Sequence, residues 1–415
     1  AFFATLMLFS NLGYAFEPTL RGFLEAGERT TIEAIEGKST LDYDYAKYYL
    51  RYRSPIRKSL NLTIVYDSYV KKYENRKELN NNTISVKSYS DYSLFVRGNS
   101  SVKLDVDLGW REKRYKDKDI YTNNQWMSKL RATYKMKDLW SVSGELGYKE
   151  YDYFLSEGRD RMEFSECVGG ERYFYNKRLQ FLALLNLRQT DFDSQPDTNQ
   201  FIYRLGIKLS PQFSFLSEMA GRLEEGRKYT DEDVEDDIEE EQEGDYYFKY
   251  RKWWWMTEHP VFERMYTVIK YTEYNKNYTT ADYDFTWYEI ENRWRYLFLE
   301  NSVNRLSFVF TYLHRETDYS QMKISSYDKD SVEMLVDFCR KNNWATLLKL
   351  GLGIDDYTIG KEKDKKTYSM GIQFEKEIVL DKLALAAEYK YKLKDYLIKP
   401  DKTQNAGRLS LDYKF

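Results

Sequence analysis

One run of residues is dense enough in carboxylates to attract cations. Residues 231–245 read DEDVEDDIEEEQEGD, with eleven acidic residues and no basic one. The run lacks the spacing and the central glycine of a calcium-binding loop. It is therefore open to three interpretations: a solvated surface loop, a divalent-ion site, or a loop that folds inward against a basic wall. The carboxylates singled out are Asp231, Glu232, Asp233, Glu235, Asp236, Asp237, Glu239, Glu240 and Glu241.

Groups that could catalyse a reaction are scarce. The chain has two histidines: His259 precedes Pro260 in an expected turn, and His314 lies on the apolar face of its segment. No G-x-S-x-G, H-E-x-x-H or phosphate-loop pattern is present. The two cysteines, Cys167 and Cys339, are too few for a disulfide scaffold or a cysteine-based metal site, and we expect them to be unpaired. The histidines and cysteines thus predict no enzyme, no metal site formed by them and no cofactor.

Within the segments that must position the charged side chains, apolar and polar residues alternate with a period of two. This pattern is typical of β-strands with one apolar and one wet face. The clearest segment is residues 102–111, where one face holds Val102, Leu104, Val106, Leu108 and Trp110, and the other holds Lys103, Asp105, Asp107 and Arg111. Such segments recur between alternately short and long connections. They predict about twenty strands, within a range of about 16 to 22. Residues 162–174 and 179–188 do not reveal which face is wet.

The last segment, residues 405–415, reads NAGRLSLDYKF and ends on an aromatic residue. Its apolar face holds Leu409, Leu411, Tyr413 and Phe415. In this ending the chain resembles bacterial outer-membrane β-barrel proteins, whose assembly machinery reads such a terminal strand. The resemblance implies an all-β, transmembrane, antiparallel up-and-down barrel over residues 16–415. Its surroundings would be outer-membrane lipid and lipopolysaccharide, with both termini and the short turns periplasmic, and the acidic run in an extracellular loop.

The composition fits a barrel. Hydrophobic residues make up 42% of the chain, aromatic residues 17%, and the mean hydropathy is −0.75. A barrel can be this polar because only alternate strand residues face lipid. The net charge of −3 gives no field for binding nucleic acid. Residues 1–15 resemble the remnant of a signal peptide. We expect prolines in the connections, and the three tryptophans 253–255 in an aromatic girdle beside the short turn at Pro260.

Twenty strands about 4.8 Å apart and tilted by about 40° give a backbone radius of roughly 20 Å, too wide for side chains to fill. Cations outnumber carboxylates on the wet faces, and a ring of one charge on a pore wall selects ions of the other. The predicted pore-lining residues are Lys103, Arg111, Lys129, Arg131, Arg204, Lys208, Arg293, Arg295 and Lys349. Further wet-face cations are Lys47, Arg51, Lys135, Arg315 and Arg408. The other interpretation is that these charges only pair across strands.

The sequence therefore predicts a porin-like channel for passive diffusion of small polar or anionic solutes. The alternative is a structural barrel that sheathes a periplasmic protein partner, such as a multihaem electron-transfer protein.

Overall fold

The computed structural model describes most of the chain. The described residues are 19–33, 43–57, 60–74, 76–97, 99–116, 121–155, 159–193, 197–211, 213–230, 246–278, 284–301, 303–321, 325–340, 344–359, 361–379, 382–398 and 401–414. The predicted signal peptide, the acidic run 231–245 and Phe415 lie outside them.

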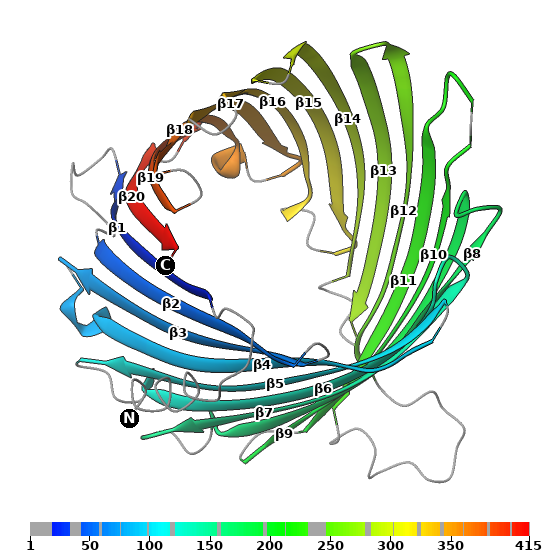
Figure 1. Cartoon of the computed structure of the whole chain (residues 1–415). Helices are drawn as coiled ribbons and strands as arrows, with labels where there is room; N and C mark the ends of the chain where they lie inside the picture. Colours follow the sequence, from blue (N-terminus) through cyan, green and yellow to red (C-terminus); the bar gives the residue numbers. More distant parts are fainter. Residues whose placement is uncertain are drawn as a thin grey trace, which may run out of the picture.

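The chain forms one 20-stranded antiparallel sheet that closes into a barrel (Figure 1). The strands are β1 Thr19–Glu33, β2 Tyr43–Arg57, β3 Leu60–Tyr73, β4 Asn81–Arg97, β5 Ser100–Tyr115, β6 Asn123–Met136, β7 Trp140–Tyr153, β8 Arg161–Phe174, β9 Leu179–Phe192, β10 Thr198–Leu209, β11 Glu218–Thr230, β12 Tyr246–Phe262, β13 Met265–Tyr278, β14 Phe285–Glu300, β15 Asn304–Tyr319, β16 Tyr327–Arg340, β17 Trp344–Tyr357, β18 Lys365–Val379, β19 Leu383–Tyr396 and β20 Lys402–Lys414. Each strand pairs with its sequence neighbours, and β20 pairs with β1. The predicted fold class and strand number are confirmed.

The alternation of the sequence becomes two faces of the wall. Large apolar side chains are exposed on the outer face, as Leu108 (55%), Val168 (58%) and Leu409 (60%) illustrate. Rows of aromatic rings bound this apolar band. Toward one rim, Trp110 and Trp126 have ring centroids 6.3 Å apart; toward the other, the centroids of Tyr134 and Trp140 are 4.9 Å apart. An apolar band between aromatic girdles is the outer surface expected of a barrel in a membrane. No helix in the described residues is long and apolar enough to span a bilayer.

The structure settles both ambiguous segments. In β9, Leu185 and Leu187 are exposed on the outer face, so Leu182 and Leu184 point inward. In β8, Val168 faces outward and Cys167 inward. Cys167 and Cys339 are free thiols in β8 and β16.

Two expectations about β2 and β12 were wrong. Pro55 and Pro260 lie inside the ends of these strands and not in connections, at places where the register shifts by a bulge. A bulge tolerates proline because the ladder is already interrupted there. The tryptophans 253–255 lie in the middle of β12 and not beside its turn, because the strand continues to Phe262.

One rim of the barrel carries a repeated loop that the sequence analysis did not identify. We call it the long-loop rim; it holds the connections that follow β3, β5, β7 and the other odd-numbered strands. In eight of these connections the strand ends on an inward aromatic residue. Its backbone N–H donates, over 2.6–3.1 Å, to a side-chain oxygen five to seven residues later: Tyr73 to Asn80, Tyr115 to Thr122, Tyr153 to Asp160, Phe192 to Asp197, Tyr278 to Asp284, Tyr319 to Ser326, Tyr357 to Asp364 and Tyr396 to Asp401.

The capping residues also bond to the neighbouring hairpin. The main-chain oxygen of Asn80 accepts from the N–H of Lys116 at 3.0 Å, and that of Ser326 accepts from Thr358 at 3.0 Å. Short side chains with an acceptor oxygen suit this role because they reach back to the backbone locally. The caps hold the backbone at the end of each of these strands, where the inner aromatic residue lies.

Candidate functional site: the inner wall

A cavity of about 1030 Å³ hollows the inner wall where β17–β20 meet β1–β5. On β2, β3 and β4 the residues that line it alternate along the strand, as Tyr43, Tyr45 and Lys47 do on β2. They identify the inner face, and residues directly opposite across a strand pair lie on the same face. The inner face can thus be followed around the whole barrel from the strand register.

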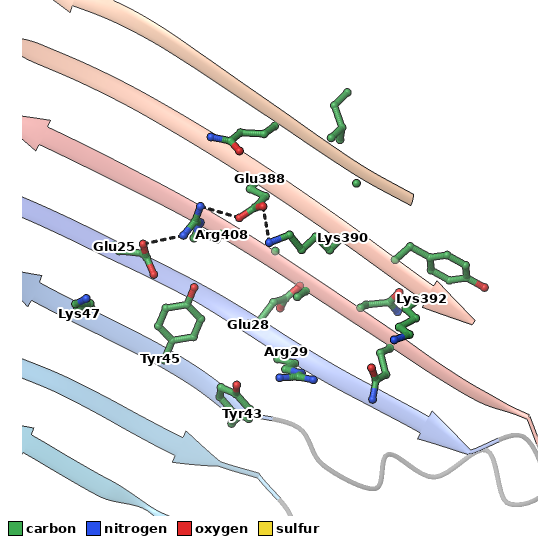
Figure 2. A pocket seen from close by; sticks show the side chains of 18 of the residues that line it. Glu25, Glu28, Arg29, Tyr43, Tyr45, Lys47, Glu388, Lys390, Lys392 and Arg408 are labelled. Atoms are coloured by element: carbon green, nitrogen blue, oxygen red, sulfur yellow. Dashed lines mark hydrogen bonds and ion pairs between the residues drawn. The ribbon is translucent and has the colours of Figure 1, made fainter. Parts of the chain in front are cut away.

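An ion-pair ladder crosses the first part of this cavity (Figure 2). Arg408 of β20 lies between Glu25 of β1, at 3.4 Å, and Glu388 of β19, at 2.8 Å. Lys390 adds a contact of 2.6 Å to Glu388. On β16 and β17, Glu333 and Lys349 pair at 2.7 Å. These carboxylates are therefore already compensated by cations.

The rest of the cavity has cations without carboxylate partners. Among the described residues, its lining cations Arg29, Lys47, Lys87, Arg111 and Lys392 form no ion pair. We call these five residues the basic recess. The lining carboxylates without a cation are Glu28 and Asp67, and Asp67 has one buried oxygen with no hydrogen-bond partner. The recess keeps an excess of positive charge.

A tyrosine shapes the recess. The Tyr45 ring lies close to Gly27 on β1, and a Cβ atom built on Gly27 would lie 2.8 Å from this ring. It would also lie 2.4 Å from the carbonyl oxygen of Gly407. Only glycine fits where the ring approaches the wall this closely. The ring centroids of Tyr45 and Tyr69 are 5.8 Å apart, so aromatic surface continues along the recess.

Every predicted pore-lining residue lies on the inner face, but most of them are ion-paired. The paired ones are Lys103 with Asp105, Lys129 and Arg131 with Glu145, Arg204 with Glu224, Lys208 with Glu218, Arg293 with Glu291 and Lys349 with Glu333. We call the group Lys129, Arg131, Glu145, Arg204, Glu224, Lys208 and Glu218, on β6–β11, the paired wall. Of the predicted residues, Arg111 lines the recess, and Arg295 lies on β14 opposite Tyr266 and Val309.

The sequence prediction omits Arg29, Lys87 and Lys392, although alternation places them on wet faces. Lys87, for instance, shares its face with Ser85 and Tyr89. The sequence does not reveal which residues lie opposite these cations on the adjacent strands, and none of those opposite Lys87 and Arg111 is acidic. Lys87 lies opposite Val65 and Gly109, and Arg111 lies opposite Ser85 and Gln125. A strand register was needed to recognise them as uncompensated.

The remaining candidates do not form a reactive site. His314 Nδ1 lies 3.0 Å from Asp330 on the outer face, and His259 Nδ1 lies 2.9 Å from the carbonyl oxygen of Phe215. The described residues contain no group of three or more His, Cys, Asp or Glu that could hold a metal.

In the turn after β6, hydrogen bonding from Lys177 lowers the pKa of the Asp138 carboxyl. Leu409 and Leu411 of β20 are exposed on the outer face.

Comparisons with known proteins show the fold. No family model matches the sequence, and no curated protein does. Among solved structures, the open form of the ferric-catecholate import receptor Fiu from E. coli K12 aligns with a TM-score of 0.58 at 8% identity, over 94% of this chain and 81% of that chain. The copper transporter OprC aligns with a TM-score of 0.57 at 8% identity, over 96% and 80%. The siderophore receptor PirA from Acinetobacter baumannii aligns with a TM-score of 0.57 at 7% identity, over 97% and 81%.

Proposed function

We propose that this barrel is a bacterial outer-membrane channel through which small anionic solutes diffuse passively. The observation that carries the proposal is the basic recess, where Lys47, Lys87 and Arg111 face the lumen without a carboxylate partner in the described residues. Uncompensated charge of one sign on a pore wall raises the local concentration of ions of the other sign. The recess would therefore enrich anions along the path.

The outer surface supports a membrane location. Its apolar band lies between aromatic rows, and its exposed side chains include Leu146 at 55% and Ile372 at 46%. The three barrels aligned above are described as an import receptor, a siderophore receptor and a copper transporter, which agrees with a transport role. In this proposal the lipid and lipopolysaccharide of the outer membrane surround the barrel. The assembly machinery reads Leu409, Leu411, Tyr413 and Phe415, and both termini are periplasmic with the acidic run outside.

Conductance in a planar bilayer tests the proposal. The full-length protein, purified in detergent and inserted alone, is expected to give stable open channels. In a potassium chloride gradient its reversal potential should have the sign of chloride preference. A barrel that does not conduct alone would contradict the channel and favour the sheath around a protein partner. A cation-selective wild type would contradict the role of the recess.

A further inference from the structure

A second, smaller cavity of about 220 Å³ lies at the long-loop end of the recess. We call it the rim cavity. It is formed by the inner faces of β3, β4 and β5, and by Leu79 of the short 3-10 helix η1 Lys77–Leu79. It shares Tyr69, Thr83 and Arg111 with the larger cavity. A solute in the recess can therefore reach it along one continuous surface.

The rim cavity is lined by cations and tyrosines and has no carboxylate in its lining. Its cations are Lys71, Arg111 and Lys113, none of which forms an ion pair in the part of the chain that the structure describes. The Lys113 ammonium lies 4.6 Å from the ring centroid of Tyr115, and the Lys71 ammonium lies 5.3 Å from that of Tyr69. Cation–π contacts hold these ammonium groups in place without neutralising their charge. The cavity is thus positive and aromatic at once.

The capped loops hold this arrangement in place before any ligand arrives. The N–H of Tyr73 donates to Asn80 at 2.6 Å, and the N–H of Tyr115 donates to Thr122 at 3.1 Å. Beneath the rings, Thr83 is 7% exposed. A site whose groups are already ordered loses less entropy on binding.

We infer that the rim cavity binds aromatic carboxylates. The guanidinium of Arg111 offers the planar pair of donors that a carboxylate accepts. The rings of Tyr69, Tyr73 and Tyr115 can contact a flat ligand ring face to edge or offset. A hydrated inorganic anion would gain nothing from these rings. The inference rests on the proposed function, because it names a substrate class for the same lumen.

Calorimetry on the detergent-solubilised full-length barrel tests this ligand class. Four probes separate its features: benzoate, cyclohexanecarboxylate, benzyl alcohol and phosphate. We expect benzoate to bind about fivefold more tightly than cyclohexanecarboxylate, which keeps the charge and loses the flat ring. We expect it to bind at least about tenfold more tightly than benzyl alcohol, which keeps the ring and loses the charge. Phosphate binding as tight as that of benzoate, or equal affinity for the two carboxylates, would overturn the inference.

Variants locate the site. Lys113→Gln and Tyr115→Leu should each weaken benzoate binding by about fivefold or more, because the first removes one of the three cations and the second one of the three rings that line the cavity. Arg295→Gln is the control, since Arg295 lies on the inner face of β14 and lines neither cavity, and it should change the affinity less than about twofold. Heat-modifiable gel migration verifies that each barrel is folded. If Tyr115→Leu does not fold, the affinity of Lys113→Gln for benzoate alone tests whether the rim cavity is the binding site. Unchanged affinity in Lys113→Gln would refute the rim cavity as the site.

The two proposals can fail separately, because calorimetry in detergent does not depend on conduction. An anion-selective channel that does not bind benzoate would refute the inference alone. A barrel that binds benzoate and does not conduct would refute only the proposed function.

Discussion

The basic recess and the paired wall lie on the same inner face and use the same residue types, but their charge differs. In the paired wall, Glu145 lies directly opposite Arg131 and binds Lys129 as well, at 2.7 Å. In the recess, Lys87 and Arg111 have only neutral residues opposite them. The charge that a passing solute meets therefore depends on the cross-strand neighbour more than on the number of lysines and arginines.

Lys47 shows a second way to remain uncompensated. It lies opposite Glu25 in the β1–β2 register, so a simple pair would be expected. Glu25 instead contacts Arg408, which in turn contacts Glu388. One guanidinium thus engages two carboxylates and leaves Lys47 without one.

The largest expected effect comes from reversing the charge of the recess. In the triple variant Lys47→Glu, Lys87→Glu, Arg111→Glu, the wall that attracted anions would attract cations. We expect the chloride-to-potassium permeability ratio, measured from the reversal potential, to pass from above one to below one. A ratio that stays above one would mean that the recess does not control selectivity.

A smaller effect should follow when the paired wall is made to resemble the recess. Glu145→Gln leaves Lys129 and Arg131 without their shared carboxylate. Since these side chains are 38% and 46% exposed, the free energy of unfolding should fall by no more than about 1 kcal/mol. The permeability ratio should shift further toward chloride. The double variant Glu145→Gln, Lys129→Gln, which keeps the net charge, is the control and should show a smaller shift.

The difference between the basic recess and the paired wall shows which features could be predicted from the sequence. Period-two alternation was sufficient to predict about twenty strands and to assign Lys129, Arg204 and Arg111 to wet faces, and the resemblance of the last segment to outer-membrane proteins added the closed barrel. Alternation could not distinguish the first two, which are paired, from Arg111, because pairing is fixed by register between strands that the sequence does not align. Pro55 and Pro260 were misplaced because bulges leave no clear sequence pattern. The caps were detectable, since an aromatic residue precedes an Asx, Ser or Thr by five to seven residues in each repeat.

Deleting the acidic run 231–245 should have a still smaller effect, and in the same direction as Glu145→Gln. A loop at one mouth attracts cations within a screening length of about 10 Å at 0.1 M salt, whereas the wall acts along the whole path. We expect the deletion to increase the preference for chloride modestly, as measured from the reversal potential in 0.1 M salt. The difference should vanish at 1 M salt. A decreased preference for chloride would show that the run does not oppose the wall.

The smallest effect is expected outside the lumen, at the exposed pair of Asp138 and Lys177. Because Lys177 lowers the pKa of Asp138, the contribution of this pair to stability is present above the ordinary carboxyl pKa. It is lost as the pH falls through the lowered value. Asp138→Asn should leave the permeability ratio unchanged at pH 7. It should remove only this dependence of stability on acid pH, which is measured by urea unfolding at a series of pH values. A changed ratio would show that charges in the turns also act on the path.

The most direct test compares the two regions by neutralising each in the same way. One variant carries Lys47→Gln, Lys87→Gln and Arg111→Gln. The other neutralises three whole ion pairs of the paired wall, with Lys129→Gln and Glu145→Gln, Arg204→Gln and Glu224→Gln, and Lys208→Gln and Glu218→Gln. Both lose three positive charges, the second together with their carboxylate partners, and the reversal potential in a potassium chloride gradient is measured for each. We predict that the recess variant loses most of its chloride preference and that the paired-wall variant loses distinctly less. Equal losses would contradict the claim that uncompensated cations, and not the total positive charge of the wall, make this barrel select anions.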